Sequence, residues 1–256
     1  MTAGGARIEG ALRRAIDARR PAIAAFLTAG YPDRARFTAC LRSAASAADV
    51  VEIGVPFSDP VADGPTIQRA SGVAIRDGMT LASLLEELRA GAALSAPVVL
   101  MSYVNPLLAY GPRRFAHDAA ASGVHGVILP DLPLQEQDLL APDLRDASIA
   151  LVQLVAPTTP PERARRLALT SEGFVYAIAV TGTTGGAAGD AAPLRRAIAM
   201  LKEACATPVL AGFGIRDASH VASLVPPADG VVVGSALVEA IDAGVEPAAF
   251  LAGLTR

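Results

Sequence analysis

Short apolar runs recur eight times along the chain, and stretches with helical spacing separate them. The runs cover residues 22–27, 49–53, 98–103, 126–129, 149–154, 174–179, 208–211 and 230–233. Several are apolar without alternation, as is typical of strands buried on both faces. Eight strands alternating with helices within 256 residues predict one (β/α)8 barrel domain that spans residues 1–256.

Two helices are expected beyond the eight-fold repeat. The arginine-rich opening segment predicts an extra N-terminal helix, and the long interval after the second run leaves room for another near residues 66–76. A doubly wound open sheet is the alternative fold. The absence of G-x-G-x-x-G after the first run weakens that alternative.

Composition limits the possible partners and the compartment. A 52% hydrophobic chain with 18% charged residues can bury a large core, and a net charge of −3 argues against nucleic acid as a main partner. Cys40 and Cys205 form neither a disulfide framework nor a metal-binding spacing, which favours a reducing cytoplasm. The sequence has no secretory h-region and no apolar run long enough to span a membrane. Neither a secretory signal nor a membrane-spanning segment is therefore expected.

The chain lacks the residues that several catalytic mechanisms require. The one lysine, Lys202, lies in a helical stretch, so a Schiff-base aldolase is close to excluded. His117 and His220 also lie in helical stretches, and His125 precedes its strand on the non-catalytic side. These positions disfavour a metal-dependent aldolase and a Ser-His-Asp triad. No metal and no other cofactor is expected, and carboxylates and hydroxyls remain.

Glu52 is the strongest catalytic candidate, because it interrupts the apolar strand DVVEI. A buried carboxyl is costly unless it is paired or functional. It is either a core carboxylate held by neighbouring groups or a general acid–base whose pKa is raised by apolar surroundings. Asp63 follows in a loop rich in proline and glycine, where a loop cap is the commoner role. Asp59 and Asp131 are weaker candidates, because aspartate near proline often shapes a turn.

Glycine turns follow the seventh and eighth runs. In barrels these loops commonly bind phosphate through backbone N–H groups, and Gly214, Gly234 and Ser235 fit that place. Four aromatic residues fall at or near strand ends and suit a flat apolar ligand group beside the phosphate. They are Phe26, Tyr103, Tyr176 and Phe213.

The segment VEIGVPFSDPVADGPTIQRA at residues 51–70 resembles the signature of the tryptophan synthase alpha subunit family. Further similar blocks follow in the same order: PVVLMSYVNP, GVILPDLP, LVAPTTPPER, GFVYAIAVTGTTG, PVLAGFGI and ADGVVVGSALV. The similarity covers essentially the whole chain. It implies a barrel that cleaves indole-3-glycerol phosphate into indole and glyceraldehyde 3-phosphate, without metal or Schiff base, in the cytoplasmic synthesis of tryptophan.

The resemblance also implies roles for individual residues. Glu52 matches the general acid–base, and Asp63 matches the carboxylate that stabilises the developing indole N–H cation. The substrate-binding positions are Tyr176, Phe26, Leu100, Ile128, Phe213 and Thr184, and the phosphate-binding positions are Gly185, Gly214, Gly234 and Ser235. Asp59 and Asn105 match positions near the contact with a beta subunit, with which an alpha2-beta2 heterotetramer is expected.

The sixth-strand loop departs from the family pattern S-x-x-G-V-T-G, because Ala179 replaces the serine and Thr183 replaces the valine. Both the subunit of a synthase complex and a stand-alone indole-forming lyase share these motifs. A different phosphosugar isomerase or epimerase is a further alternative, which the Glu52 and Asp63 spacing disfavours. A catalytically quiet activating subunit is another, and the retained catalytic pair and glycine turns speak against it.

Overall fold

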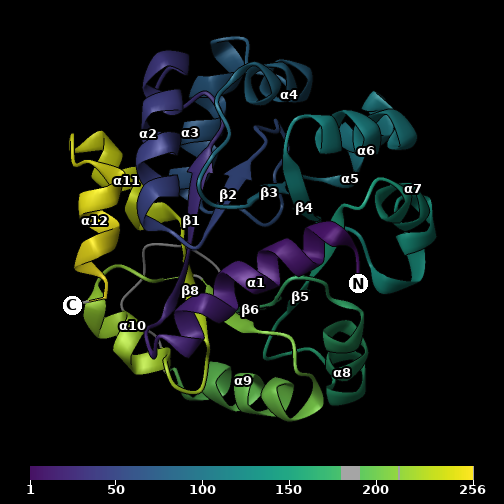
Figure 1. Cartoon of the computed structure of the whole chain (residues 1–256), viewed down its shortest axis with the longest axis vertical. Coiled ribbons are helices and arrows are strands. Elements are labelled where there is room, and N and C mark those ends of the chain that lie inside the picture. The colour runs from purple at the N-terminus through teal and green to yellow at the C-terminus, as the bar shows by residue number, and fades with distance from the viewer. Residues whose placement is uncertain (180–190, 213, 256) are drawn as a thin grey trace.

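The eight predicted strands form a closed parallel barrel in which each strand pairs with its neighbours in sequence and β8 pairs with β1. The computed structural model describes residues 1–179, 191–212 and 214–255. The strands are β1 (Ala22–Thr28), β2 (Val50–Gly54), β3 (Val98–Met101), β4 (Val124–Ile128), β5 (Ala150–Val155), β6 (Val175–Ile178), β7 (Val209–Gly212) and β8 (Gly230–Val233). The predicted barrel is therefore confirmed, and Figure 1 shows its surrounding ring of helices.

Helices follow the strands and pack on the outside of the barrel. They are α2 (Arg34–Ala47), α3 (Pro65–Arg76), α4 (Leu81–Ala90), α5 (Val104–Tyr110), α6 (Pro112–Ala121), α7 (Ala141–Asp146), α8 (Pro161–Thr170), α9 (Ala192–Ala204), α10 (Ala218–Leu224), α11 (Ser235–Asp242) and α12 (Pro247–Gly253), with a 3-10 helix at Leu134–Leu139. Helix α3 is the extra helix predicted near residues 66–76. In the part of the chain that is described, no helix is long and apolar enough to cross a membrane.

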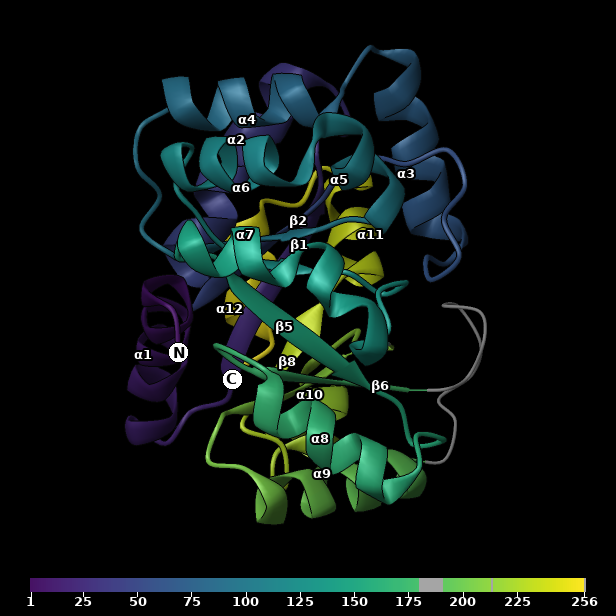
Figure 2. The same ribbon diagram turned by 90° about the vertical axis from the view of Figure 1, so that its right-hand side faces the viewer.

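The predicted N-terminal helix, α1 (Ala3–Asp17), covers the amino-terminal end of the barrel. The side chain of Ile8 joins the interior cluster and would meet any side chain added at Gly126 or Gly173. In Figure 2, α1 lies at the left while the arrows of β5 and β6 point away from it, to the right. With one end covered by α1, the carboxyl ends of the strands are the open side for a site.

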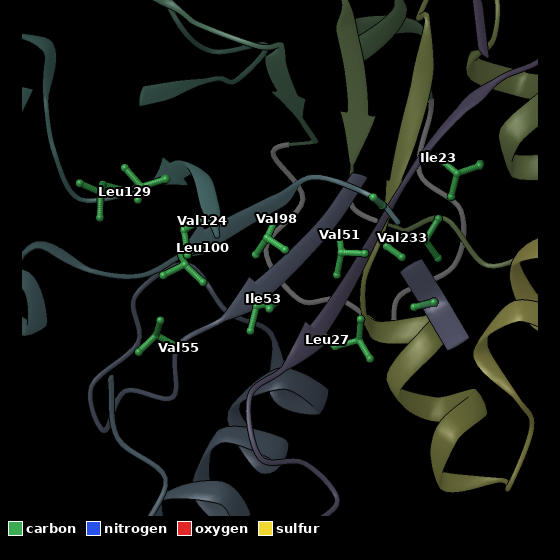
Figure 3. Packing of buried hydrophobic residues seen from close by; sticks show 14 of the residues in the cluster. Ile23, Leu27, Val51, Ile53, Val55, Val98, Leu100, Val124, Leu129 and Val233 are labelled. Carbon is green, nitrogen blue, oxygen red and sulfur yellow. The ribbon is translucent and has the colours of Figure 1, made fainter. Parts of the chain in front are cut away.

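Alternation along the strands divides the core into two layers. One set of side chains fills the barrel interior, and the other packs between the strands and the helices. Figure 3 shows the outer layer, in which Leu27, Ile53 and Leu100 belong to the same cluster. Residues on alternate positions of the same strands, such as Phe26 and Glu52, therefore point into the barrel.

The third strand is shorter than the sequence predicted. Strand β3 ends at Met101, and Tyr103 occupies the N-cap position of the following helix α5, so the strand does not extend to residue 103. Asp131, from the loop after β4, accepts the backbone N–H of Val104 at 3.0 and 3.1 Å. Asp131 thus anchors the start of α5.

Candidate active site

Glu52 lies on the interior face of the barrel between apolar neighbours. Its Cα is paired with Phe26 on β1 and Val99 on β3, and its side chain is 1% exposed. Neither carboxyl oxygen has a hydrogen-bond partner among the described residues. The core-carboxylate alternative required such a partner, so this geometry favours a functional acid.

Burial raises the pKa of Glu52 from an ordinary 4.5 to about 8, and the nearby charge of Asp63 adds to the effect. Desolvation disfavours the charged carboxylate, and a second negative charge disfavours it further. Glu52 is therefore protonated at neutral pH and able to donate a proton, which is the state that a general acid needs.

Asp63 lies in the loop between β2 and α3, where Tyr103 holds it. The Tyr103 hydroxyl donates to Asp63 Oδ2 at 3.1 Å and accepts the backbone N–H of Ala62, also at 3.1 Å. The ring of Tyr103 is buried and lies 5.1 Å from the ring of Phe57. Burial raises the pKa of Asp63, while the bond from Tyr103 lowers it. One side chain thus fixes the backbone and the carboxylate of the same loop.

Tyr176 reaches the same region from β6. Burial raises the pKa of its hydroxyl well above the usual value, and the charges of Glu52 and Asp63 raise it further. A Cβ added at Gly212 on β7 would lie 2.2 Å from Cε2 of the Tyr176 ring, so only glycine leaves room for this tyrosine. The structure therefore brings Glu52, Asp63 and Tyr176 into one electrostatic neighbourhood.

The glycine turns follow the carboxyl ends of β7 and β8. Gly234 precedes helix α11, whose first residue is Ser235, and no side chain in the described part of the chain caps that end. A Cβ at Gly234 would lie 3.8 Å from Phe26. Gly214 has a φ of +82°, in the region that favours glycine. Uncapped N–H groups beside the apolar interior suit an anionic group attached to an apolar ligand.

One residue predicted to line the substrate pocket, Leu100, does not face the barrel interior. Phe26 and Ile128 belong to the interior cluster, whereas Leu100 packs in the outer layer with Ile53. The pairing of Glu52 with Val99 turns Val99 and Met101 inward, so Met101 takes the place predicted for Leu100. The run Val98–Met101 is apolar at every position, so the sequence carries no signal for its inward face.

The remaining predicted site residues lie at the rim or outside the described structure. Asp59 and Asn105 are both exposed, on the loop after β2 and on helix α5. Thr184, Gly185 and Phe213 lie outside the described residues, as does Thr183 of the sixth-strand loop. Within the described ranges, no group of three metal-binding side chains occurs.

The Glu52→Gln variant should lack the loss of stability that the wild type shows as the pH rises. Between about pH 4.5 and about pH 8 the folded protein keeps a proton on Glu52 that the unfolded chain releases, so rising pH favours unfolding. The free energy of unfolding of the wild type should therefore fall relative to that of the variant, by about 1.4 kcal/mol per pH unit within this window.

Denaturant unfolding of both proteins across this pH range measures the difference. Other titrating groups are common to the two proteins, so their contributions largely cancel. A constant difference in stability from acidic to mildly alkaline pH would show that Glu52 ionises normally.

Comparison with known proteins places the chain in a family. A family model described as the tryptophan synthase alpha chain matches residues 12–251. The tryptophan synthase alpha chain of Acidiphilium cryptum is 44% identical over 243 residues, covering 94% of this chain and 88% of its own length. That of Desulfovibrio desulfuricans is also 44% identical, over 254 residues, with 96% and 98% covered.

Solved structures agree with the sequence relatives. A structure of Mycobacterium tuberculosis tryptophan synthase superimposes with a TM-score of 0.90 at 35% identity, covering 97% of this chain and 96% of that one. The alpha chain of Legionella pneumophila gives 0.86 at 30% identity, with 99% and 96% covered. The chain belongs to the tryptophan synthase alpha chain family, the lyases that cleave indole-3-glycerol phosphate in tryptophan biosynthesis.

Proposed function

We propose that this chain carries out the cleavage with Glu52 as general acid–base and Asp63 as electrostatic partner. The observation that supports this most strongly is the buried carboxyl of Glu52, which has no hydrogen-bond partner among the described residues and whose pKa lies near 8. The indole ring would occupy the interior between Phe26, Met101 and Ile128, with Tyr176 beside the glycerol phosphate. Thr184 and Phe213 are proposed to complete this pocket.

The proposed reaction is a retro-aldol cleavage. Glu52 gives its proton to C3 of the indole ring, which places positive charge on the ring N–H, and the Asp63 carboxylate stabilises that charge. The bond between C3 and the adjacent carbinol carbon then breaks, and its electrons return to the ring. The carbinol oxygen loses its proton to the Glu52 carboxylate and becomes the aldehyde of glyceraldehyde 3-phosphate. Proton and electrons balance without a metal or a Schiff base.

The phosphate would be bound by the glycine turns. Gly214, Gly234 and Ser235 offer backbone N–H groups and one hydroxyl, and Gly185 is proposed to contribute from the loop after β6. An anion at the first turn of α11 gains from the helix dipole. Because Gly234 adjoins Phe26, this site would hold the phosphate within one substrate length of Glu52.

Glu52→Gln should retain the fold and lose most lyase activity. The amide fills the same volume but cannot donate the proton, so we expect a ~10²–10⁴-fold fall in kcat. Indole release from indole-3-glycerol phosphate measures it. Glu86→Gln is the matched control, because Glu86 is exposed on helix α4. Activity of the Glu52 variant within about threefold of the control would contradict the proposed function.

Tyr103→Phe should lower kcat/KM by roughly tenfold, since it removes the hydroxyl that holds Asp63 and Ala62. Without that bond the pKa of Asp63 should rise, and the acidic limb of the kcat/KM profile should move to higher pH. Tyr110→Phe is the control, because the Tyr110 hydroxyl donates to Asp118, on helix α6. An unchanged pH profile of kcat/KM would show that Tyr103 does not position Asp63.

We further propose that the chain works in the cytoplasm as the alpha subunit of an alpha2-beta2 complex. Asp59 and Asn105 are exposed at the carboxyl ends of two neighbouring strands, beside the loop that carries Asp63. A partner seated there would contact the loop directly and stabilise its catalytic arrangement.

A beta subunit from the same organism should raise indole formation by at least tenfold. Asp59→Lys should weaken that activation while leaving the activity of the isolated chain within about twofold. Titration of the chain with the beta subunit under steady-state assay measures both effects. High turnover in isolation without measurable binding would favour the stand-alone lyase.

A further inference from the structure

Thr28 is a second buried polar group without a partner. It ends strand β1, its side chain is 2% exposed, and its Oγ1 forms no hydrogen bond with the described residues. Only Thr28 and Glu52 combine these properties among the described side chains. A hydroxyl left unbonded in the core costs free energy, and native proteins contain few such groups, so each one points to a functional role or to a partner outside the protein.

Strand alternation places Thr28 on the interior face. Ala24 and Phe26 belong to the interior cluster, while Ala25 and Leu27 pack in the outer layer. Thr28 continues the inward set at the carboxyl end of β1. Its Cα is paired with Gly54, which has no side chain to offer a hydrogen bond. The hydroxyl is thus one inward position, about 7 Å along the strand, beyond the level of Glu52.

The glycerol chain of the proposed substrate would place hydroxyls near Thr28 at the end of β1. Glu52 must reach the carbon that joins the ring to the glycerol chain, and the phosphate is assigned to Gly234. Phe26 is paired with Glu52 and lies next to Gly234, and Thr28 follows Phe26 on the same face. The glycerol chain, with its two hydroxyls, must therefore pass beside Phe26 and toward Thr28.

We propose that the Thr28 hydroxyl binds a hydroxyl of the substrate's glycerol chain and so selects for a hydroxylated chain between ring and phosphate. This inference rests on the proposed function. A threonine hydroxyl both donates and accepts, so it can pair with either orientation of an alcohol. Its bond to substrate supplies the partner that the buried oxygen lacks among the described residues.

The test compares Thr28→Val with two ligands. Valine preserves the shape and removes the hydroxyl, so kcat/KM for indole-3-glycerol phosphate should fall at least tenfold. Affinity for indole-3-propanol phosphate, which lacks both glycerol hydroxyls, should stay within about twofold. The Tm should be equal to or above that of the wild type, since the hydroxyl has no hydrogen bond to the described residues that could be lost.

Two further variants complete the design. Thr28→Ser should recover most of the lost kcat/KM, because it restores a hydroxyl at the same Cβ. Thr38→Val, at an exposed position of helix α2, is the control for the substitution itself. Equal weakening of both ligands, or a lower Tm with no loss of kcat/KM, would assign Thr28 to packing and overturn the proposal.

Glu52→Gln in the same assay separates the two hypotheses. If Glu52→Gln loses activity while Thr28→Val matches the wild type, only the role of Thr28 fails. If Glu52→Gln remains active, or if the wild type does not bind indole-3-propanol phosphate, the proposed function itself fails.

Discussion

The uncompensated burial of the Glu52 carboxyl is the constraint around which the site is arranged. In the closed barrel its Cα neighbours on the adjacent strands are Phe26 and Val99, and no described residue gives the carboxyl a hydrogen bond. The nearby charge, that of Asp63, is also negative and raises the cost of ionising Glu52. The protein lowers the cost by keeping the carboxyl protonated, because the neutral acid is far cheaper to bury than the anion. The same desolvation that destabilises the fold produces an acid of the strength that carbon protonation near neutral pH requires.

The surroundings of the second carboxyl, that of Asp63, favour its charged form more than those of Glu52 do. Asp63 is only partly buried, and its oxygen accepts the Tyr103 hydroxyl, so its charged form is better supported than that of Glu52. Two carboxyls in neighbouring positions but different surroundings can therefore divide the acid and anion roles. Tyr103 belongs to the segment that starts α5, so the helix that carries Asn105 at the rim is mechanically linked to the Asp63 loop.

Much of this architecture was predictable from local sequence. Apolar runs separated by helical stretches predicted every strand, and a glutamate inside DVVEI marked the site, because burial of a charge has few structural explanations. The face to which a side chain points and the distant residues that it contacts were not predictable. Leu100 and Met101 are equally apolar, and only the register with β2 decides which one points inward. Likewise, nothing local indicates that Tyr103 caps a helix and bonds Asp63 forty residues away.

The protonation state of Glu52 tests the account most directly. Infrared difference spectra of the wild type against Glu52→Gln, recorded across pH, isolate the C=O stretch of this one carboxylic acid. We expect a protonated-acid band that persists at neutral pH and disappears with a midpoint near 8. A midpoint near the ordinary value of 4.5 would mean that Glu52 is charged at neutral pH, and the general acid would have to be sought elsewhere.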